Sequence, residues 1–253
     1  GDIPPIEPVL REYNNIECRD AVLAYDAIEP DVDGLGKVRT RWGGQMMKSP
    51  VTGEDIPDPT NQVTIYRYLN PRAAGWQEAD YIVSNPPFIG KLYLLERLTE
   101  GYVEALRNVY EDKVPDGADF VMYWWYRAAK LVSQKKIHCF GFITTNSIWQ
   151  SFNRRVVSKA LSSDQPISII FAIPDHPWVD DANAAAVRIA MTAAKIGEKF
   201  GIIAKVISEV KSSNGEAELE FAFSTGRIHE DLHIGANIIA AQQLKSNSFL
   251  AST

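Results

Sequence analysis

Cysteine is scarce in this sequence, because its 253 residues include only Cys18 and Cys139. Two thiols cannot build the dense disulfide framework that stabilises small secreted domains. Both lie inside apolar runs, which is typical of reduced, buried thiols in a cytosolic protein. We therefore expect a chain that is stabilised by a hydrophobic core, which its 45% of hydrophobic residues can supply.

Excess positive charge and long apolar runs are also lacking. The 26 Lys and Arg residues are outnumbered by 32 Asp and Glu residues, and the formal net charge is -6. This balance argues against binding nucleic acid by phosphate neutralisation over the whole surface, so any DNA contact must be local. No run approaches the ~18 apolar residues of a membrane span, and no signal peptide opens the chain. These absences predict a cytoplasmic protein with no membrane partner.

The second part of the chain has the pattern of an α/β fold. From about residue 80 onward, short apolar runs alternate with helical patterns, which predicts βαβ units and a mostly parallel sheet. We expect buried strands at Tyr81 to Val83, Ile137 to Thr145, Ile167 to Ile173 and about Ala184 to Ala193. Further strands, whose place in the sheet the sequence leaves open, are expected at Gly201 to Val210 and Glu218 to Phe223.

Two helices are expected between these strands. Asp116 or Asp119 can cap a helix that runs to about Gln134. Ser147 and Gln150 have the spacing of a capping box, which predicts a helix through Val156 and Ala160.

The first part of the chain is less regular. A short strand is expected from Asn15 to Cys18, ending near Asp20. The stretch from Asp31 to Trp76 is rich in Gly, Pro and Asp, so we interpret it as an excursion from the core with a hairpin that includes Val63 to Tyr68.

The sharpest chemical signal is Asn85-Pro86-Pro87-Phe88, directly after a buried strand. Methyl transfer to an exocyclic amine is difficult because the nitrogen lone pair is delocalised into the ring. Uncharged acceptors for the amino hydrogens counter this, and an Asn side chain and a proline carbonyl provide them on a rigid turn. The aromatic ring offers a stacking face for a base taken out of a duplex. The carboxyl end of a parallel strand is also where open α/β sheets bind their ligands.

The motif alone leaves alternatives open. A proline-rich turn can simply close a strand, with Phe88 in the core. An Asn-Pro-Pro-Tyr or Asn-Pro-Pro-Phe motif also resembles those of enzymes that methylate adenine in DNA, bases in ribosomal RNA, or glutamine in release factors.

The resemblance extends beyond this tetrapeptide. The sequence resembles the methyltransferase region of single-chain type II restriction-modification enzymes, which are gamma-class DNA adenine-N6 methyltransferases. The segments that carry it are Ile16-Glu17-Cys18-Arg19-Asp20-Ala21-Val22, Ser84-Asn85-Pro86-Pro87-Phe88-Ile89-Gly90, Val114-Pro115-Asp116-Gly117-Ala118-Asp119, Thr144-Thr145-Asn146-Ser147-Ile148, and Pro177-Trp178-Val179 with Ala186-Val187-Arg188.

The resemblance implies a partial Rossmann-like fold that uses S-adenosylmethionine, with a mostly parallel sheet and helices on both faces. It also implies methylation of a flipped adenine in duplex DNA, with Asn85, Pro86, Pro87 and Phe88 as catalytic residues and Asp20 near the adenine of the cofactor. A nuclease and a target-recognition domain are implied in the same polypeptide, and the recognised DNA site would be read by the latter.

One expected feature of that family is missing. No glycine-rich cofactor loop follows a strand, since Gly34-Leu35-Gly36 lies in a polar excursion and is interpreted as a turn. Both chain ends also look like cuts. We therefore expect a fragment with residues 1–30 around the third strand, 31–79 as the excursion, 80–200 as the target-base half and 201–253 as an extension toward the target-recognition domain.

A fragment of this kind should bind S-adenosylmethionine very weakly and methylate nothing unaided. Without the strand that would precede the glycine loop, Tyr81 to Val83 forms an unpaired edge. We expect the fragment to self-associate at that edge or to cover it with its own excursion.

Competing motifs are weaker. His229-Glu230-Asp231-Leu232-His233 matches the zinc pattern H-E-x-x-H, but Gly226 and Gly235 bracket it too closely for a long helix, so a loop without metal is the better interpretation. Neither cysteine follows a proline, which argues against cytosine-C5 methylation. Four residues stay open between site and structural roles: Asn146, Trp178, Arg154 and Arg155.

Overall fold

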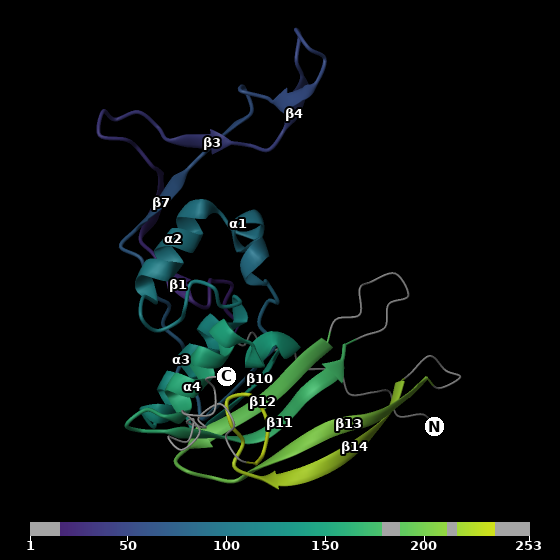
Figure 1. Cartoon of the computed structure of the whole chain (residues 1–253). Helices are drawn as coiled ribbons and strands as arrows, with labels where there is room; N and C mark the ends of the chain where they lie inside the picture. Colours follow the sequence, from purple (N-terminus) through teal and green to yellow (C-terminus); the bar gives the residue numbers. More distant parts are fainter. Residues whose placement is uncertain (1–15, 179–187, 212–216, 236–253) are drawn as a thin grey trace, which may run out of the picture.

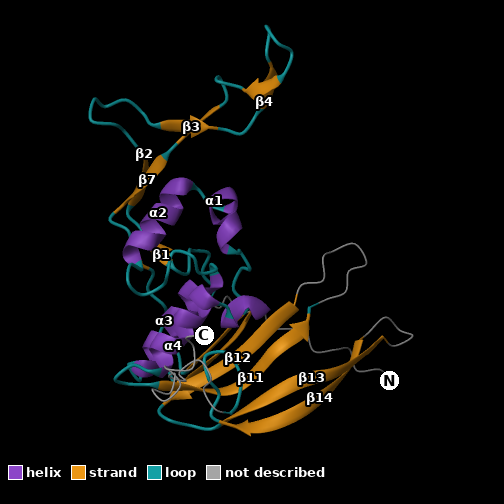
Figure 2. Ribbon diagram, viewed as in Figure 1, coloured by secondary structure: helices purple, strands orange, loops and turns teal. Residues whose placement is uncertain are grey.

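The computed structural model describes residues 16–178, 188–211 and 217–235 (Figure 1). These residues form a six-stranded sheet, helices that pack on it, and a long hairpin that extends away from both (Figures 1 and 2). None of the described helices is long and apolar enough to span a membrane.

The large sheet has the strand order β14-β13-β11-β12-β10-β9. Its strands are β9 (Tyr81–Ser84), β10 (Cys139–Thr145), β11 (Ile167–Pro177), β12 (Arg188–Ile196), β13 (Gly201–Lys211) and β14 (Ala217–Gly226). Every strand expected after residue 80 is therefore present. β11 extends beyond its predicted end, and the first four residues of the strand predicted from Ala184 lie outside the described residues. β13 and β14 join the same sheet, so residue 200 is not a boundary of the sheet.

The prediction of a mostly parallel sheet is wrong for the described strands. Only β9 with β10 and β11 with β13 are parallel, whereas β10–β12, β11–β12 and β13–β14 are antiparallel. The reason lies in the connections. Only residues 178–187 separate β11 from β12, and only residues 212–216 separate β13 from β14. A parallel neighbour needs a crossover of about a dozen residues or more.

The helical layer precedes and interrupts these strands. It comprises η1 (Lys91–Tyr93), α1 (Leu94–Arg97), α2 (Glu100–Val109), α3 (Val121–Ser133), η2 (Asn146–Trp149) and α4 (Ser151–Leu161). α3 and α4 contact each other and the sheet, and they lie on one side of it (Figure 2). The expectation of helices on both faces is not met by the described residues.

α3 supplies Tyr123, Trp124 and Trp125 to the aromatic core. The Trp125 ring meets the Phe140 ring of β10 edge to face at 5.3 Å, and its indole N–H donates to Thr192 Oγ1 of β12 at 3.3 Å. Both residues on the sheet are buried. Trp125 thus joins two adjacent strands through one side chain, with its polar atom satisfied as burial requires.

The capping prediction for α4 is wrong in its detail. Gln150 is the residue that precedes α4, and it makes no side-chain cap. Ser147 lies in η2, and its hydroxyl donates to Asp119 Oδ2 at 2.6 Å. The short 3-10 turn therefore takes the place of the predicted capping box.

The excursion is a two-stranded hairpin, which confirms the prediction around Val63 to Tyr68. We call Ala27 to Leu69 the arm; its paired segments are β2 (Ala27–Pro30) with β7 (Tyr66–Leu69), β3 (Thr40–Trp42) with β6 (Gln62–Thr64), and β4 (Met46–Lys48) with β5 (Asp55–Pro57). At its base, β1 (Leu23–Ala24) pairs with β8 (Arg72–Ala73). Gly34 and Gly36 lie in a turn of the arm, where the Gly36 N–H donates to the Asp33 carbonyl at 3.0 Å.

Packing against α2 anchors the arm. The Tyr68 ring lies edge to face with Tyr25 and Tyr102, and its hydroxyl is 3.3 Å from Thr99 Oγ1. Gly101 packs so closely that a Cβ there would lie 1.6 Å from the Tyr66 carbonyl oxygen. The base of the arm is thus packed against α2, which lies after the Asn85–Phe88 turn in the sequence, beyond η1 and α1.

The cysteines and the first predicted strand differ from expectation. Cys18 is exposed and Cys139 is half-buried in β10, so the prediction of two buried thiols is wrong. Residues 16–18 form no strand, and Asn15 lies outside the described residues. An apolar neighbourhood in the sequence does not bury Cys18, because no strand pairing holds its segment against the core.

β9 is an edge strand of the large sheet among the described residues. It pairs with β10 alone, and Tyr81 and Val83 are 66% and 86% exposed. The segments of the arm pair with one another, so in this part of the chain the excursion does not cover the edge.

The close approach at Gly101 can be tested by substitution. We expect Gly101→Ala to lower the free energy of unfolding by about 1–3 kcal/mol, because overpacking against backbone outweighs the better helix propensity of Ala. Gly34→Ala is the matched control, since nothing lies within 4 Å of its Cβ position. Urea denaturation measures both, and equal stability of the two variants would contradict the packing described.

The buried tyrosines predict loss of stability in alkali. Burial raises the pKa values of Tyr102, Tyr110 and Tyr126, and it raises the pKa of Tyr123 to about 12. Tyrosines of the unfolded chain release their protons at about pH 10, so the stability is complete below that pH and falls as the pH rises through it. Urea unfolding at several pH values, with tyrosinate absorbance, checks this. A free energy of unfolding that stays constant from about pH 9 to pH 11 would show that these hydroxyls are not protected.

Candidate functional site

The Asn85–Phe88 turn begins where β9 ends. β9 is parallel to β10, so the loops that follow both strands lie at the same edge of the sheet. Pro86 is buried, Phe88 is half-buried, and Asn85 and Pro87 are exposed. The turn is therefore fixed at one proline and presents a polar side chain and a ring near the surface.

Two acceptors in this turn are free. The Pro87 carbonyl accepts from the Ile89 N–H at 3.2 Å, which closes the turn. In the described part of the chain, neither the Asn85 side chain nor the Pro86 carbonyl takes part in a hydrogen bond. An Asn that served only to cap or close the turn would use its amide for that purpose.

An aromatic pair stands beside these acceptors. The rings of Phe88 and Trp178 are 6.4 Å apart with an interplanar angle of 77°. Trp178 directly follows β11 and is half-buried. The structure thus places Trp178, whose role the sequence left open, against the last residue of the motif.

A partly buried hydrogen-bond network fixes the chain just beyond the motif. Asp119 Oδ1 accepts from the Lys91 N–H at 3.2 Å, and Asp119 Oδ2 accepts from Ser147 Oγ at 2.6 Å and from Asn153 Nδ2 at 2.7 Å. The Phe120 N–H donates to the Ile89 carbonyl at 2.9 Å. This carboxylate therefore joins the loop after β9 to the loop after β10.

Sequence reasoning missed this role. Asp119 was expected as a helix cap, yet α3 begins after Phe120, which makes no side-chain cap. Asn153, which is 4% exposed, accepts from the Asp119 N–H at 2.8 Å and donates to the Ser147 carbonyl at 3.1 Å. Residues so far apart in the chain give no periodic signal. The one available signal is that a polar side chain such as Asn153, if it is buried, must find hydrogen-bond partners inside the protein.

Asp20 lies elsewhere and is already engaged. Its Oδ1 accepts from the Val22 and Leu23 N–H groups at 2.8 and 2.9 Å, and its Oδ2 accepts from the Tyr102 hydroxyl at 2.6 Å. No hydrogen bond or ion pair among the described residues links it to the Asn85–Phe88 turn. Its observed contacts shape the turn before β1, and its cofactor role stays a prediction.

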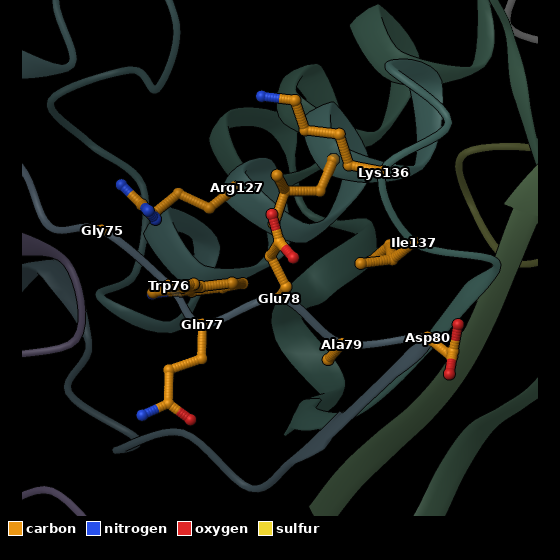
Figure 3. Close-up of a pocket in the computed structure, with 10 residues that line it drawn as sticks. Gly75, Trp76, Gln77, Glu78, Ala79, Asp80, Arg127, Lys136 and Ile137 are labelled. Carbon is orange, nitrogen blue, oxygen red and sulfur yellow. The ribbon is translucent and has the colours of Figure 1, made fainter.

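A surface hollow of about 780 Å³ lies at the other end of the parallel strands (Figure 3). Asp80, which precedes β9, and Ile137, which precedes β10, line it together with Trp76. The Arg127 guanidinium lies over the Trp76 ring at 4.8 Å and donates to the Ala74 carbonyl and the Tyr110 hydroxyl. Size alone would favour this hollow, but it does not include the motif.

The His229–His233 segment forms a tight turn in the structure. The His229 N–H donates to the His233 carbonyl at 2.9 Å, and Leu232 between them is buried with a φ of 58°. No cluster of three metal-ligating side chains occurs among residues 16–178, 188–211 and 217–235.

Asn146 donates to Asp175 Oδ1 at 3.2 Å, and Asp175 also pairs with Arg188 at 2.7 Å.

The Asp119 network predicts a specific sensitivity to charge. Both carboxylate oxygens accept hydrogen bonds, so in Asp119→Asn the amide nitrogen must face a donor in either orientation. We expect a loss of about 1–3 kcal/mol in stability and faster exchange of the Lys91 amide hydrogen. Asp116→Asn is the control, because its exposed side chain has only a 4.0 Å contact with Arg107. Unchanged exchange at Lys91 in Asp119→Asn would refute the bridging role.

Comparisons with known proteins identify the family of the chain. A family model described as "MmeI, DNA-methyltransferase domain" matches residues 38–201, which is more than half of the chain. None of the curated proteins matches. Among solved structures, the type IIL restriction-modification enzyme MmeI in complex with DNA is 26% identical, with a TM-score of 0.44 over 64% of this chain and 21% of that one.

A second solved structure is a modification subunit attributed to a type I restriction enzyme from Vibrio vulnificus YJ016. It is 12% identical, with a TM-score of 0.36 over 51% of this chain and 25% of that one. The chain thus spans about a fifth to a quarter of the length of these two proteins. On the match of residues 38–201, the chain belongs to the family of MmeI DNA-methyltransferase domains.

Proposed function

We propose that this domain methylates the N6 amino group of an adenine flipped out of duplex DNA, as part of a restriction-modification protein. The observation that carries the proposal is the Asn85–Phe88 turn itself. It follows a strand at the carboxyl edge of the sheet and sets Phe88 beside Trp178. Within the described residues, the Asn85 amide and the Pro86 carbonyl are free of hydrogen bonds. The family match supports DNA methylation, and the turn supports an exocyclic amine as the acceptor.

The role that we assign to each residue follows from the needs of an exocyclic amine, whose two hydrogens require acceptors and whose base requires a stacking surface. Asn85 Oδ1 and the Pro86 carbonyl accept the two amino hydrogens, which withdraws the nitrogen lone pair from the ring. Phe88 stacks on the base and Pro87 closes the turn that holds the acceptors in place. With both amino hydrogens held, the N6 lone pair would be free to take a methyl group from a bound donor, and the proton that N6 then gives up would leave to solvent.

S-adenosylmethionine would supply an electrophilic methyl group when bound. The described residues fit the base better than the cofactor. The glycines at 34 and 36 lie in a turn of the arm, and Asp20 is engaged by three protein donors. Its carboxylate keeps acceptor capacity for one further donor. The predicted contact of Asp20 with the cofactor therefore depends on that remaining capacity.

A second candidate keeps the same turn with another substrate. Ribosomal RNA bases and protein glutamine also present an amino group that needs two acceptors. The family match favours DNA over both. The MmeI structure that contains DNA, and the fraction of it that this chain spans, are consistent with recognition and nuclease domains in the same natural protein.

The test is methyl transfer by the natural protein that carries this chain. Labelled S-adenosylmethionine is offered with duplex DNA, ribosomal RNA or a release factor, and the modified nucleoside or residue is identified. We expect N6-methyladenine in DNA. Label found only in RNA or protein would replace this proposal with the second candidate.

Asn85→Ala and Phe88→Ala should reduce the transfer rate by about 10² to 10³ without loss of the fold, because both side chains act on the base. Asn108→Ala and Phe200→Ala are matched controls, since both residues are exposed and lie outside the turn. Near-normal methylation by a folded Asn85→Ala protein would contradict the assigned role.

A further inference from the structure

Lys91, Phe152 and Arg155 form a cation–aromatic patch beside the candidate site. The Lys91 ammonium lies 5.0 Å from the centroid of the Phe152 ring, and the Arg155 guanidinium carbon lies 5.2 Å from it. All three side chains are exposed, with Phe152 at 37%. The Phe152 ring of α4 thus lies at the surface between a cation of η1, Lys91, and a cation of its own helix, Arg155.

These two cations differ from others in the chain. Within the described residues, neither Lys91 nor Arg155 has a carboxylate within 4.0 Å, whereas cations of the arm such as Arg39 and Lys48 pair with Asp at 2.8 and 2.9 Å. An aromatic ring orients a cation without neutralising it. In a chain with a formal charge of -6, the patch therefore keeps local positive charge available to an anion.

The patch is built rather than incidental. The Phe152 ring packs so closely on Gly117 that a Cβ there would lie 2.9–3.1 Å from its atoms. The backbone N–H of Lys91 and the side chain of Asn153 both bind Asp119. The Asp119 network thus fixes both sides of the patch, the backbone at Lys91 and the α4 helix that carries Phe152 and Arg155. Lys91 also lies only three residues beyond Phe88.

We propose that this patch is a subsite for the phosphate backbone of the nucleic acid whose base enters the Asn85–Phe88 turn. A flipped base remains attached to its backbone, so phosphates must pass close to the turn. Paired phosphate contacts position the strand and carry no sequence information. The inference rests on the proposed function and adds the residues that hold the substrate strand.

Salt-dependent binding tests the subsite. Affinity of the full chain for a fluorescent 20-base-pair duplex is measured by anisotropy over a range of salt concentrations, for wild type and for Lys91→Gln/Arg155→Gln. Each lost phosphate contact should reduce the slope of log affinity against log salt by about 0.9, so the double variant should lose about two units. Phe152→Leu should give a smaller loss, and Arg155→Lys should retain most of the slope.

The matched control is Lys136→Gln/Lys195→Gln, which removes the same charge at the opposite end of the parallel strands. It should leave the slope unchanged. An equal loss in both double variants, or no binding by the wild type, would overturn the subsite.

Catalysis separates this inference from the proposed function. In the natural protein, the Lys91→Gln/Arg155→Gln change should raise KM for DNA and leave kcat at saturating DNA nearly unchanged, whereas Asn85→Ala should lower kcat. If the wild type transfers no methyl group but the Lys91→Gln/Arg155→Gln change still reduces the salt slope, the proposed reaction is wrong and the subsite stands. A lower kcat with an unchanged slope would remove the subsite alone.

Discussion

The carboxylate of Asp119 is the constraint on which the candidate site depends. It accepts hydrogen bonds from the loop after β9, from the loop after β10 and from α4, and the first of these lies far in sequence from the other two. Bonds to a charged acceptor are stronger than neutral ones, and half-burial reduces competition from water. Because adjacent parallel strands bring their following loops to one edge, a single carboxylate there can hold both loops in register.

The core explains why this arrangement can be rigid. α3 begins at Val121, two residues after Asp119, and aromatic side chains of α3 pack against the sheet. Trp125 contacts β10 through a ring and β12 through a hydrogen bond. In the middle of α3, Arg127 contacts the chain before β9, because its guanidinium donates to the Ala74 carbonyl and lies over the Trp76 ring. One helix therefore positions both the beginning of the motif strand and the loop that follows it.

The sequence predicted local features better than pairings. Strands after residue 80, the hairpin and the motif could be predicted because periodicity, turn residues and adjacent prolines act over a few positions. The parallel sheet was wrong because alternation of strands and helices stops after β11, and short connections then enforce antiparallel neighbours. The Asp119–Asn153 bonds and the Lys91–Phe152–Arg155 patch were not predictable, since each joins residues far apart in sequence. Cys18 shows the same limit, because apolar neighbours did not decide its burial.

The free acceptors of the turn carry an energetic cost that the surrounding contacts offset. Pro86 is buried, and within the described residues its carbonyl has no hydrogen-bond partner. Any part of that carbonyl which is shielded from water loses hydration that it would have in an unfolded chain. A flexible loop would relieve this by turning the carbonyl toward water. Two fixed proline φ angles, the Pro87–Ile89 bond and the Asp119 clamp on Lys91 prevent that rearrangement. These contacts thus fix the turn in one conformation. The function proposed for it needs such preorganisation, because a fixed pair of acceptors favours an amino group over a substrate that lacks one.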